Sequence, residues 1–321
     1  MAHAPTPILC LSGGEIARLL EPAAAIAALA EGFMALTRGE VHAPPRPRVD
    51  VPGRGFALAM LAWAPGKPIG LKTVNVFHHN AAHGLPSHQA LINLFDAETG
   101  VPVAVLDGAV ITGLRTAAAA VLTVREMARP DAGIATIVGA GVQARDHARL
   151  LALARPFTQI RLFARNRAAG EAAIAGIPNA TLATDLEAAV RSSDVVCLTT
   201  SAETPVIEAD WVRPGTHVTS VGFAPPGTEL PAALIDQAAV VAVEAKAAFQ
   251  PAPVGCVELA GRDPATGAEI GEILLGSKPG RTSPGDITLY KSMGNAMEDL
   301  VLAHLAYEAA RKASAGQTIV L

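Results

Sequence analysis

The sequence predicts an α/β protein in which a doubly wound parallel sheet follows an N-terminal α+β domain. Before residue 111, strand-like apolar runs follow one another with only turn signals between them. From residue 111 onward, short apolar runs alternate with helical segments. Successive strands favour an antiparallel meander, whereas alternation favours a parallel sheet with helices on both faces.

Length and composition restrict the class of protein. The 321 residues allow about two domains. Half of the residues are hydrophobic and 17% are charged, which excludes a disordered chain. The net charge of −4 and the absence of a basic stripe argue against a nucleic-acid partner.

The termini and cysteines indicate a cytoplasmic protein. The N-terminus has no basic segment before an apolar core, so no signal peptide is expected. No apolar run reaches the roughly 18 residues of a membrane span, so no membrane partner is expected either. The three cysteines are odd in number and widely spaced, which is typical of reduced thiols.

The first 110 residues combine helices with a meander. Residues 15–38 have helical spacing, and Pro22 is expected to begin a second helix. A proline-rich segment, 42–52, must be extended or looped. The expected strands, separated by turn residues, are 55–63, 69–77, 89–96 and 102–107.

The remaining elements form the parallel sheet and a terminal helix. A helix is expected at 112–129 and another, capped by Thr184 and Asp185, to Arg191. The expected strands are 134–138, 160–163, 195–199, 217–221 and 239–243. An amphipathic helix, 292–313, and a strand-like tail, 318–321, should return to the N-terminal domain. The domains are therefore 1–118 plus 300–321, for substrate binding and dimerisation, and 119–299.

The most informative motif is the turn after residues 134–138. Gly139, Gly141 and Ala144 form GxGxxA between a β-branched run and a helix. The first glycine permits a tight turn, the second lets a pyrophosphate approach the backbone, and alanine lets helix pack on strand. Phosphate would bind the free N–H groups at the helix start. The motif predicts a Rossmann-type dinucleotide site.

The end of the next strand indicates which dinucleotide binds. An acidic residue there would bind the ribose 2′-hydroxyl of NAD, but Ala164 and Arg165 occupy that position. Arg165 and Arg167 flank Asn166 and could bind a 2′-phosphate. NADP(H) is therefore the preferred cofactor and NAD(H) is possible. The alternative is two solvated arginines.

Ligands of doubly wound sheets bind beyond the carboxyl ends of the strands. Small polar or flexible residues follow two of the expected strands at this edge. We therefore expect the cofactor site to be lined by Thr200, Ser201, Val221, Gly222 and Phe223.

Three basic residues lie in or beside segments that otherwise look buried: Arg48, Lys72 and Arg115. A buried cation needs an anionic partner. That partner is either a substrate carboxylate or an internal acid such as Asp96 or Asp107, and both interpretations remain open at this point.

A group of four histidines suggests a candidate zinc site. His78, His79, His83 and His88 lie within eleven residues, but no cysteine or acid is in register with them. Solvated loop histidines are the preferred interpretation, and no metal is expected. No GxSxG or Cys–His arrangement indicates a hydrolase.

Several segments together resemble the ornithine cyclodeaminase/μ-crystallin family. They are GLKTVNVFHHN (70–80), GLPSHQALINLFDAETGVPVAVLD (84–107), ITGLRTAAAAVL (111–122), ARPDAGIATIVGAGVQA (128–144) and DITLYKSMGNAMEDL (286–300). The resemblance implies that Arg48, Lys72 and Arg115 bind a substrate carboxylate. It also implies a homodimer whose N-terminal sheets join across the two-fold axis.

The resemblance assigns further residues to ligands. Ser87, Val142 and Gln143 match cofactor positions. Ser292, Met293 and Gly294 match the segment beside the nicotinamide, where Gly294 also contacts substrate.

Two departures from the family's cyclodeaminases concern activity. Ala224 stands where they carry the aspartate of a GGD-like motif, and Ala164 stands where they carry the acid that binds NAD. Without that base, handling of the substrate amine and released ammonia is lost.

These departures favour the family's NAD(P)H-dependent imine reductases, oxidoreductases acting on CH–NH. The expected reactions are Δ1-pyrroline-2-carboxylate to L-proline and Δ1-piperideine-2-carboxylate to L-pipecolate. The alternatives are an amino-acid dehydrogenase acting on an open-chain imine, a non-catalytic NADP(H)-binding protein, and ornithine cyclodeaminase.

Overall fold

The computed structural model describes residues 6–320, without the side chains of His78 and Ala81. The chain divides into two compact units. The N-terminal unit comprises Met1–Arg115 and Asn295–Leu321, and the second unit comprises Thr116–Gly294. The boundaries predicted from the sequence follow residues 118 and 299. In the structure, residues 116–118 belong to the second unit and residues 295–299 to the N-terminal unit.

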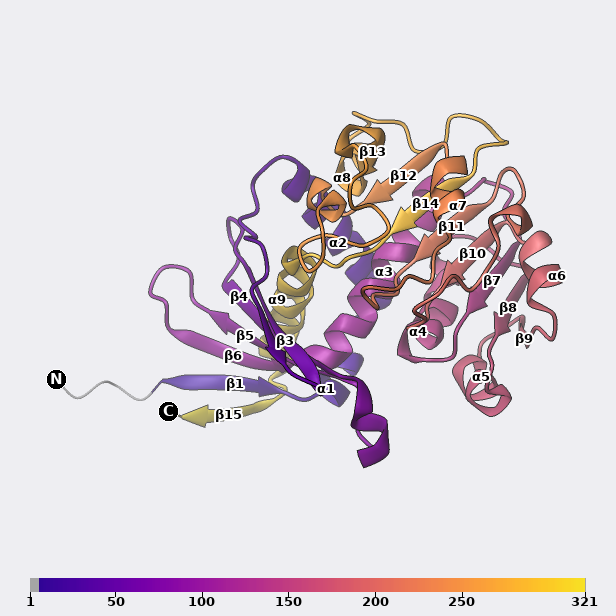
Figure 1. The fold of residues 1–321 in the computed structure, drawn as a ribbon. Coiled ribbons are helices and arrows are strands. Elements are labelled where there is room, and N and C mark those ends of the chain that lie inside the picture. Colours follow the sequence, from indigo (N-terminus) through magenta and orange to yellow (C-terminus); the bar gives the residue numbers. More distant parts are fainter. Residues whose placement is uncertain (1–5, 321) are drawn as a thin grey trace. The chain divides into compact units, whose positions relative to one another are not determined.

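The N-terminal sheet has the order β15-β1-β6-β5-β4-β3-β2 (Figure 1). Strands β2 to β6 form the expected antiparallel meander, while β1 pairs parallel to β6 and antiparallel to β15. The strands are β1 (Pro7–Leu11), β2 (Arg48–Val51), β3 (Gly55–Ala62), β4 (Ile69–Phe77), β5 (His88–Phe95), β6 (Pro102–Asp107) and β15 (Gln317–Val320).

One face of the N-terminal sheet is buried and the other is not. Along β4, every second residue from Gly70 to Val76 is buried, as expected for a strand with one covered face. Helix α9 (Ala296–Ala313) packs against β4 and against α2 (Pro22–Thr37) on the covered side. Lys72 belongs to this covered face and is paired in register with Met60 and Ile92.

The helical residues 15–38 form two helices, α1 (Gly13–Leu19) and α2. Ser12 and Glu15 form a capping box at the start of α1. The chain is extended at Leu20, and Pro22 occupies the first turn of α2, as predicted.

The terminal helix begins later than the sequence pattern indicated. Residues 292–294 were expected in the helix, but α9 begins at Ala296. The Asn295 side chain accepts from Met297 N as the N-cap, and Gly294 has a φ of +73°, which is not helical. Ser292 N instead donates to Ser220 O, so this part of the chain continues β14 (Thr288–Lys291).

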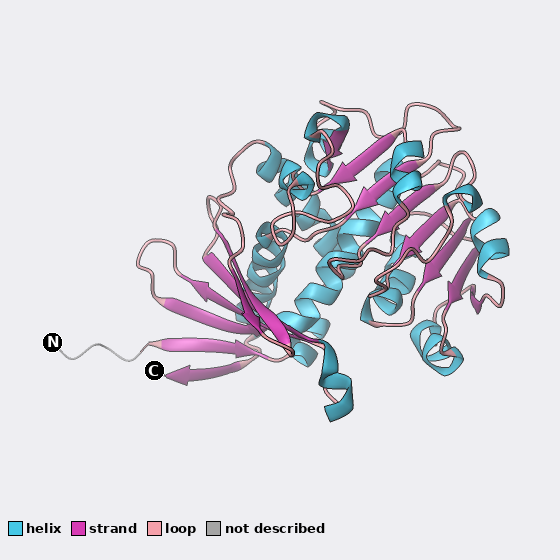
Figure 2. Ribbon diagram, in the orientation of Figure 1, coloured by secondary structure: helices cyan, strands magenta, loops and turns pink. Residues whose placement is uncertain are grey.

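The second unit contains a parallel sheet with the order β13-β12-β14-β11-β10-β7-β8-β9. Its strands are β7 (Ile134–Val138), β8 (Gln159–Phe163), β9 (Ala180–Leu182), β10 (Val195–Leu198), β11 (His217–Ser220), β12 (Val240–Val243), β13 (Gly267–Glu269) and β14. Helices lie on both faces of this sheet (Figure 2). The doubly wound α/β fold is thus confirmed.

The helices that lie wholly within this unit are short. They are α4 (Val142–Leu150), α5 (Arg167–Ile174), α6 (Leu186–Arg191), α7 (Ala232–Gln237) and α8 (Ile270–Leu274). Asn166 and Asp185 accept backbone hydrogen bonds as the N-caps of α5 and α6. The strands β9, β13 and β14 did not stand out in the sequence. Two of them are only three residues long, and β14 enters the sheet between β11 and β12.

Helix α3 (Gly108–Met127) is long and apolar enough to cross a membrane. The expectation that no such segment exists was wrong for this helix, and the bent pair α1–α2 passes the same test together. However, 72% of the apolar window of α3 is buried inside the protein, as in a core helix.

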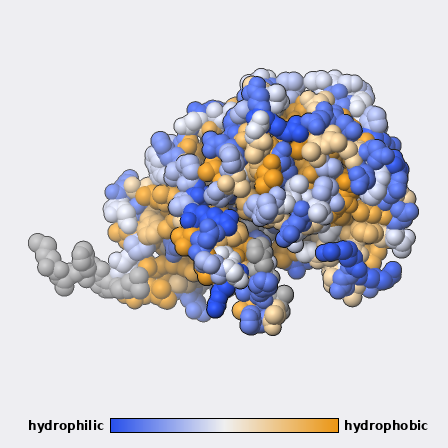
Figure 3. Space-filling model, in the orientation of Figure 1, coloured by the Kyte–Doolittle hydropathy of each residue, from blue (hydrophilic) through white to orange (hydrophobic). Residues whose placement is uncertain are grey.

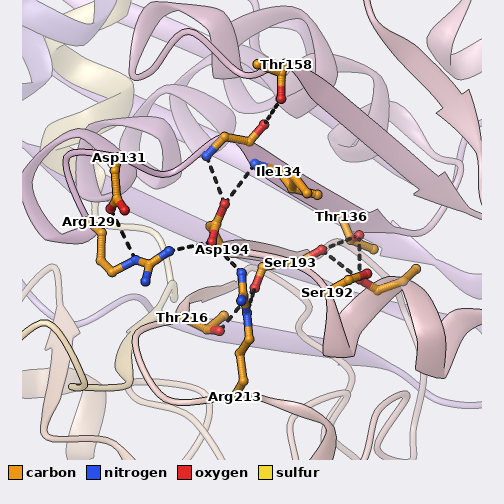
Figure 4. Close-up of polar contacts among 12 residues, drawn as sticks. Arg129, Asp131, Ile134, Thr136, Thr158, Ser192, Ser193, Asp194, Arg213 and Thr216 are labelled. Atoms are coloured by element: carbon orange, nitrogen blue, oxygen red, sulfur yellow. Dashed lines mark hydrogen bonds and ion pairs between the residues drawn. The ribbon is translucent and has the colours of Figure 1, made fainter.

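A buried carboxylate joins the amino ends of β7 and β10 (Figure 4). Asp194 Oδ2 accepts from the backbone N–H groups of Gly133 and Ile134 at 2.9 and 3.0 Å. Asp194 Oδ1 lies 2.7 Å from Arg129 Nη2 and 2.5 Å from Arg213 Nη2. These contacts stabilise the sheet at the edge opposite to the one where ligands of this fold bind.

Candidate active site

The turn after β7 has the backbone geometry of a dinucleotide-binding turn. Gly139 has a φ of +131°, and a Cβ there would lie 2.6 Å from Thr199 Oγ1, so the position requires glycine. A Cβ on Gly141 would meet nothing within 4 Å, which leaves room for a ligand. Gly141 is the N-cap of α4 and supplies no side-chain hydrogen bond. The first N–H groups of α4 can therefore receive a phosphate.

The residues that open α4 also fit a dinucleotide. Ala144 is fully buried, which allows the close packing that the motif predicts. Val142 is 54% exposed although it is apolar, and a bound cofactor could cover it. The Gln143 carbonyl accepts from His147 Nδ1 at 2.8 Å. Burial lowers the pKa of His147 to about 4, so its imidazole is neutral near pH 7.

The two arginines after β8 have different surroundings. Asn166 Oδ1 accepts from Ala169 N as the cap of α5. Arg167 Nε lies 2.9 Å from Glu171 Oε1, an exposed ion pair one turn along α5. Arg165 is exposed and forms no ion pair or hydrogen bond with the part of the chain that the structure describes. Arg165 is therefore the arginine without an ion pair, and the cofactor roles expected of both arginines stay predictions.

Glu229 holds the carboxyl ends of β10 and β11. This buried carboxylate accepts from Thr200 N and Oγ1, both at 2.7 Å. It also accepts from Ser220 Oγ at 2.9 Å and Gly222 N at 2.7 Å. These hydrogen bonds hold the predicted cofactor residues Thr200 and Gly222 in place. The predicted residue Ser201 is exposed.

A buried lysine supports the same edge. Lys291, at the end of β14, donates to Gly222 O at 2.6 Å and pairs with Glu258 Oε1 at 2.9 Å. Val221 and Phe223 are half-buried on either side of Gly222. Gly222 is thus held through its N–H by Glu229 and through its carbonyl by Lys291, which keeps this loop in one conformation.

Glu244 shapes the segment Ser292–Gly294. Its buried Oε1 accepts from Ser292 Oγ at 2.8 Å and from the backbone N–H groups of Met293 and Gly294, both at 2.9 Å. Tyr290 Oη donates to the same oxygen at 3.0 Å. Four donors on one carboxylate oxygen define the path of the three residues that the family resemblance assigns to the nicotinamide.

Within the N-terminal unit, Lys72 and Arg115 come together with two acids of α9. Lys72 Nζ lies 3.0 Å from Asp299 Oδ1, and Arg115 Nε lies 3.3 Å from the same oxygen. Arg115 Nη1 lies 2.8 Å from Glu298 Oε2. All four side chains are at least 92% buried. We call these four residues the ion-pair cluster.

The ion-pair cluster corrects one expectation from the sequence. The internal acids that pair with the cations are Glu298 and Asp299, not Asp96 or Asp107. Asp107 instead accepts from Ala109 N at the start of α3. Two positive and two negative charges make the cluster neutral, which is how a protein tolerates buried charge.

Burial changes the acidity of the lysine in this cluster. Desolvation lowers the pKa of Lys72 to about 8, although Asp299 opposes the shift. Near pH 7 the ammonium is charged, and a modest rise in pH removes its proton.

Arg48, the third predicted cation, is not in contact with the ion-pair cluster. It lies on β2, where its guanidinium pairs with Asp50 Oδ1 at 2.6 Å and stacks on Phe56, 4.1 Å from the ring centroid. Its pairing with Leu58 places it on the same sheet face as Lys72. Arg48 thus remains a candidate by its place on the sheet only.

The predicted residue Ser87 precedes β5 in the N-terminal unit, and its Oγ lies 3.1 Å from His88 Nδ1. The neighbouring histidines follow β4 in a short 3₁₀ segment, His78–His83. The side chain of His78 lies outside the described part of the structure. Among the side chains that are described, no group of three His, Cys, Asp or Glu residues could hold a metal ion.

Ala224 lies in the loop that follows β11. It pairs with Gly227 in an isolated bridge, and the methyl side chain has no group that could accept a proton. The nearest acid along the chain, Glu229, is occupied by four hydrogen bonds. No acid in this loop replaces the aspartate that the cyclodeaminase pattern requires.

Comparison with known proteins identifies the family. The sequence model described as the Ornithine cyclodeaminase/mu-crystallin family matches residues 10–314. The chain belongs to this family. The ketimine reductase mu-crystallin of Rattus norvegicus is 34% identical over 274 residues, which covers 84% of this chain and 86% of that protein.

Two solved structures share the whole fold. The Δ1-pyrroline-2-carboxylate reductase of Thermococcus litoralis, in complex with NADH and L-proline, is 30% identical with a TM-score of 0.91 and covers 97% of this chain and 100% of that one. An archaeal alanine dehydrogenase dimer with bound NAD is 29% identical with a TM-score of 0.86 and covers 98% and 99%.

Several residues of the site were missed in the sequence. Glu229, Glu244, Glu258 and Lys291 lie beside apolar strands or in loops, and no motif marks them. Glu244 does interrupt the apolar run 240–245, which is a signal for a buried partner. Asp299 lies in the first turn of a helix, where acids are common because of the helix dipole.

Proposed function

We propose that this protein is an NAD(P)H-dependent oxidoreductase acting on CH–NH bonds, and that it reduces a cyclic imino acid. The candidate substrates are Δ1-pyrroline-2-carboxylate, reduced to L-proline, and Δ1-piperideine-2-carboxylate, reduced to L-pipecolate. The observation that carries this proposal is the buried pair of cations, Lys72 and Arg115, in a chain whose relatives include imine reductases.

In this proposal Lys72 and Arg115, the two cations of the ion-pair cluster, bind the carboxylate of the substrate. The Lys72 ammonium and the Arg115 guanidinium attract a carboxylate in a site from which water is excluded, so each contact is stronger than at the surface. Fixing the carboxylate orients the adjacent C=N carbon, and orientation alone contributes several kcal/mol to such a reaction.

Little further chemistry is required from the protein. When bound, the reduced nicotinamide supplies a hydride. Addition of that hydride to the C=N carbon of a protonated imine would move the π electrons to nitrogen and give the amine without another proton, so the residues of this chain would only have to bind and orient the substrate. Ala224 is compatible with this reaction because no base has to act there.

The first prediction concerns the cations. We expect Lys72→Met to lower kcat/KM for the cyclic imine by about 10- to 100-fold, because a buried charged hydrogen bond is lost. The control is Lys67→Met, at a half-buried lysine that is not part of the ion-pair cluster. The assay is NADPH and NADH oxidation with both cyclic imines. An unchanged kcat/KM in both Lys72→Met and Arg115→Ala would exclude the proposed carboxylate site.

A second candidate function is favoured by the alanine dehydrogenase neighbour. The same cations would then hold an open-chain imine formed from a 2-oxo acid and ammonia. Oxidation of NADPH or NADH that depends on pyruvate together with ammonium would support it. Release of ammonia from ornithine would instead indicate cyclodeaminase activity, and cofactor binding without turnover on any of these substrates would indicate a binding protein.

We propose that NADP(H) is the preferred cofactor. Arg165 is exposed after β8, and no acid lies at Ala164 to bind a free ribose 2′-hydroxyl. The two solved structures described above contain NADH or NAD, so NAD(H) is the competing cofactor.

We also propose a homodimer joined through the N-terminal sheets. The uncovered face of that sheet carries Leu61 and Leu91, which are 41% and 54% exposed. Figure 3 shows apolar side chains gathered over the part of this unit that contains β1 and β6. An exposed apolar face of this kind is typical of a surface that a partner subunit covers.

We further propose a cytoplasmic role in proline metabolism. The free cysteines Cys10, Cys197 and Cys256 support the cytoplasmic location.

A further inference from the structure

Asp299 lies at the centre of the ion-pair cluster. Its Oδ1 accepts from Lys72 Nζ at 3.0 Å and from Arg115 Nε at 3.3 Å. Its Oδ2 is buried and has no hydrogen-bond partner within residues 6–320. One carboxylate oxygen therefore binds both cations, which brings the ammonium and the guanidinium to the same point.

The surroundings of Lys72 contain few other charges. The register neighbours on β3 and β5 are the apolar Met60 and Ile92. Among the described residues, the charged groups that act on Lys72 are Asp299 and Glu298 from α9 and Arg115 from α3. Arg115 repels the ammonium, and of the two acids Asp299 has the larger influence.

We propose that Asp299 is a positioning residue for the reaction: its carboxylate holds Lys72 and Arg115 side by side and keeps the Lys72 ammonium protonated while substrate binds. This inference rests on the proposed role of the two cations in binding a substrate carboxylate.

The physical reason is the cost of an unpaired buried charge. Lys72 is 2% exposed, and its ammonium has lost nearly all of its hydration. Without Asp299 it would lie beside Arg115 with no direct partner, and a lysine in that situation releases its proton. A neutral amine cannot attract a carboxylate as an ammonium does. The acid on α9 thus acts on substrate only through the lysine.

The test is the pH dependence of kcat/KM for the cyclic imine in Asp299→Asn and Asp299→Ser. Burial lowers the pKa of Lys72 to about 8, so the wild-type rate should fall as pH rises through that value. Removing the Asp299 charge favours the neutral amine, so the alkaline limb should move down by about 1 pH unit or more. Near pH 6, KM should rise modestly and kcat should change little.

Three controls separate this role from general damage. Glu298→Gln removes an equally buried charge that contacts Arg115. In this variant the alkaline limb of kcat/KM should shift less than in Asp299→Asn. Asp299→Glu keeps the negative charge, so the alkaline limb of kcat/KM should lie closer to the wild-type pH than in Asp299→Asn. Lys72→Arg replaces the ammonium with a group that stays charged, so the alkaline limb should disappear if Lys72 is its source.

The imine also titrates, so a ligand without a titratable nitrogen is needed. Binding of cyclopentanecarboxylate to the NADPH-loaded enzyme, followed by cofactor fluorescence, should weaken above pH 8 in wild type and above a lower pH in Asp299→Asn. If wild-type binding does not depend on pH, the proposed function of Lys72 fails. If wild-type binding does weaken at high pH, but binding by Asp299→Asn and Asp299→Ser weakens at the same pH as in the wild type, only the role of Asp299 fails. Failure of both variants to fold would assign Asp299 to stability and overturn the positioning role.

Discussion

Arg165 and Arg167 lie two residues apart, yet only one of them is paired. Arg167 forms an ion pair with Glu171, whereas Arg165, which follows β8, has no ion-pair partner among the described residues. Their spacing in the sequence does not indicate which of the two arginines is paired. The helical turn of α5, which brings residues four apart together, distinguishes them.

We therefore expect Arg165→Ala to reduce the preference for NADPH over NADH. The ratio of the two kcat/KM values should fall about tenfold or more, because a charged hydrogen bond to a 2′-phosphate is lost. Arg167→Ala is the matched control and should change the ratio by less than about threefold, as expected for a solvated ion pair. Equal effects of the two variants would contradict the assignment of Arg165.

The elements of the second unit depend on buried polar side chains as well as on apolar packing. His217 on β11 contacts Thr288 Oγ1 at 2.9 Å through Nδ1 and Thr123 Oγ1 at 3.2 Å through Nε2. It thereby joins β11 to β14 and to α3. Burial is the main cause that lowers the pKa of His217 to about 3, so the folded protein holds it neutral.

This arrangement predicts destabilisation by acid. Unfolded histidine binds a proton near pH 6.5, whereas folded His217 does not until about pH 3. Between these values the unfolded state binds more protons, so the free energy of unfolding falls as pH falls. The slope should approach about 1.4 kcal/mol per pH unit for this histidine, with a similar contribution from His147.

Urea unfolding at pH 7.5, 6.5, 5.5 and 5 measures this slope. His217→Gln should lower stability at pH 7.5 and reduce the slope below pH 6 by about one proton. The exposed loop residue His83 provides the control His83→Gln, which should leave both quantities unchanged. A stability that does not vary between pH 7.5 and 5 would show that the buried histidines are not protonated on unfolding.

At the scale of the whole molecule, the uncovered face of the N-terminal sheet predicts association. Light scattering after size exclusion should give a dimer, and the melting temperature should rise with protein concentration. Leu91→Glu places a charge on this face and should yield monomers that still bind cofactor, since the cofactor residues of the second unit are unchanged. Leu153→Glu, at an apolar site of the second unit that is 45% exposed, should remain dimeric. A monomeric wild type would contradict the proposal.

Local pattern was sufficient for most of the fold. The period-two alternation of β3 and β4 and the β-branched run of β7 each depend on residues that are close in sequence, so all three strands were predicted within about a residue. The short strands β9 and β13 carry too few residues for a period, and the start of α9 depends on Asn295, Gly294 and a hydrogen bond to Ser220. The apolar pattern therefore predicted a start for α9 that is a few residues too early.

The sequence by itself determined the doubly wound sheet, the glycine turn of a dinucleotide site and the presence of buried cations, because glycine spacing and charge in apolar runs are local properties. Only the tertiary structure decided which acids meet those cations. Asp299 is 227 residues from Lys72 along the chain, and Glu298 is 183 residues from Arg115. Such pairs arise because α9 brings its two acids to Lys72 on β4 and to Arg115 on α3, and no spacing in a single sequence records those contacts.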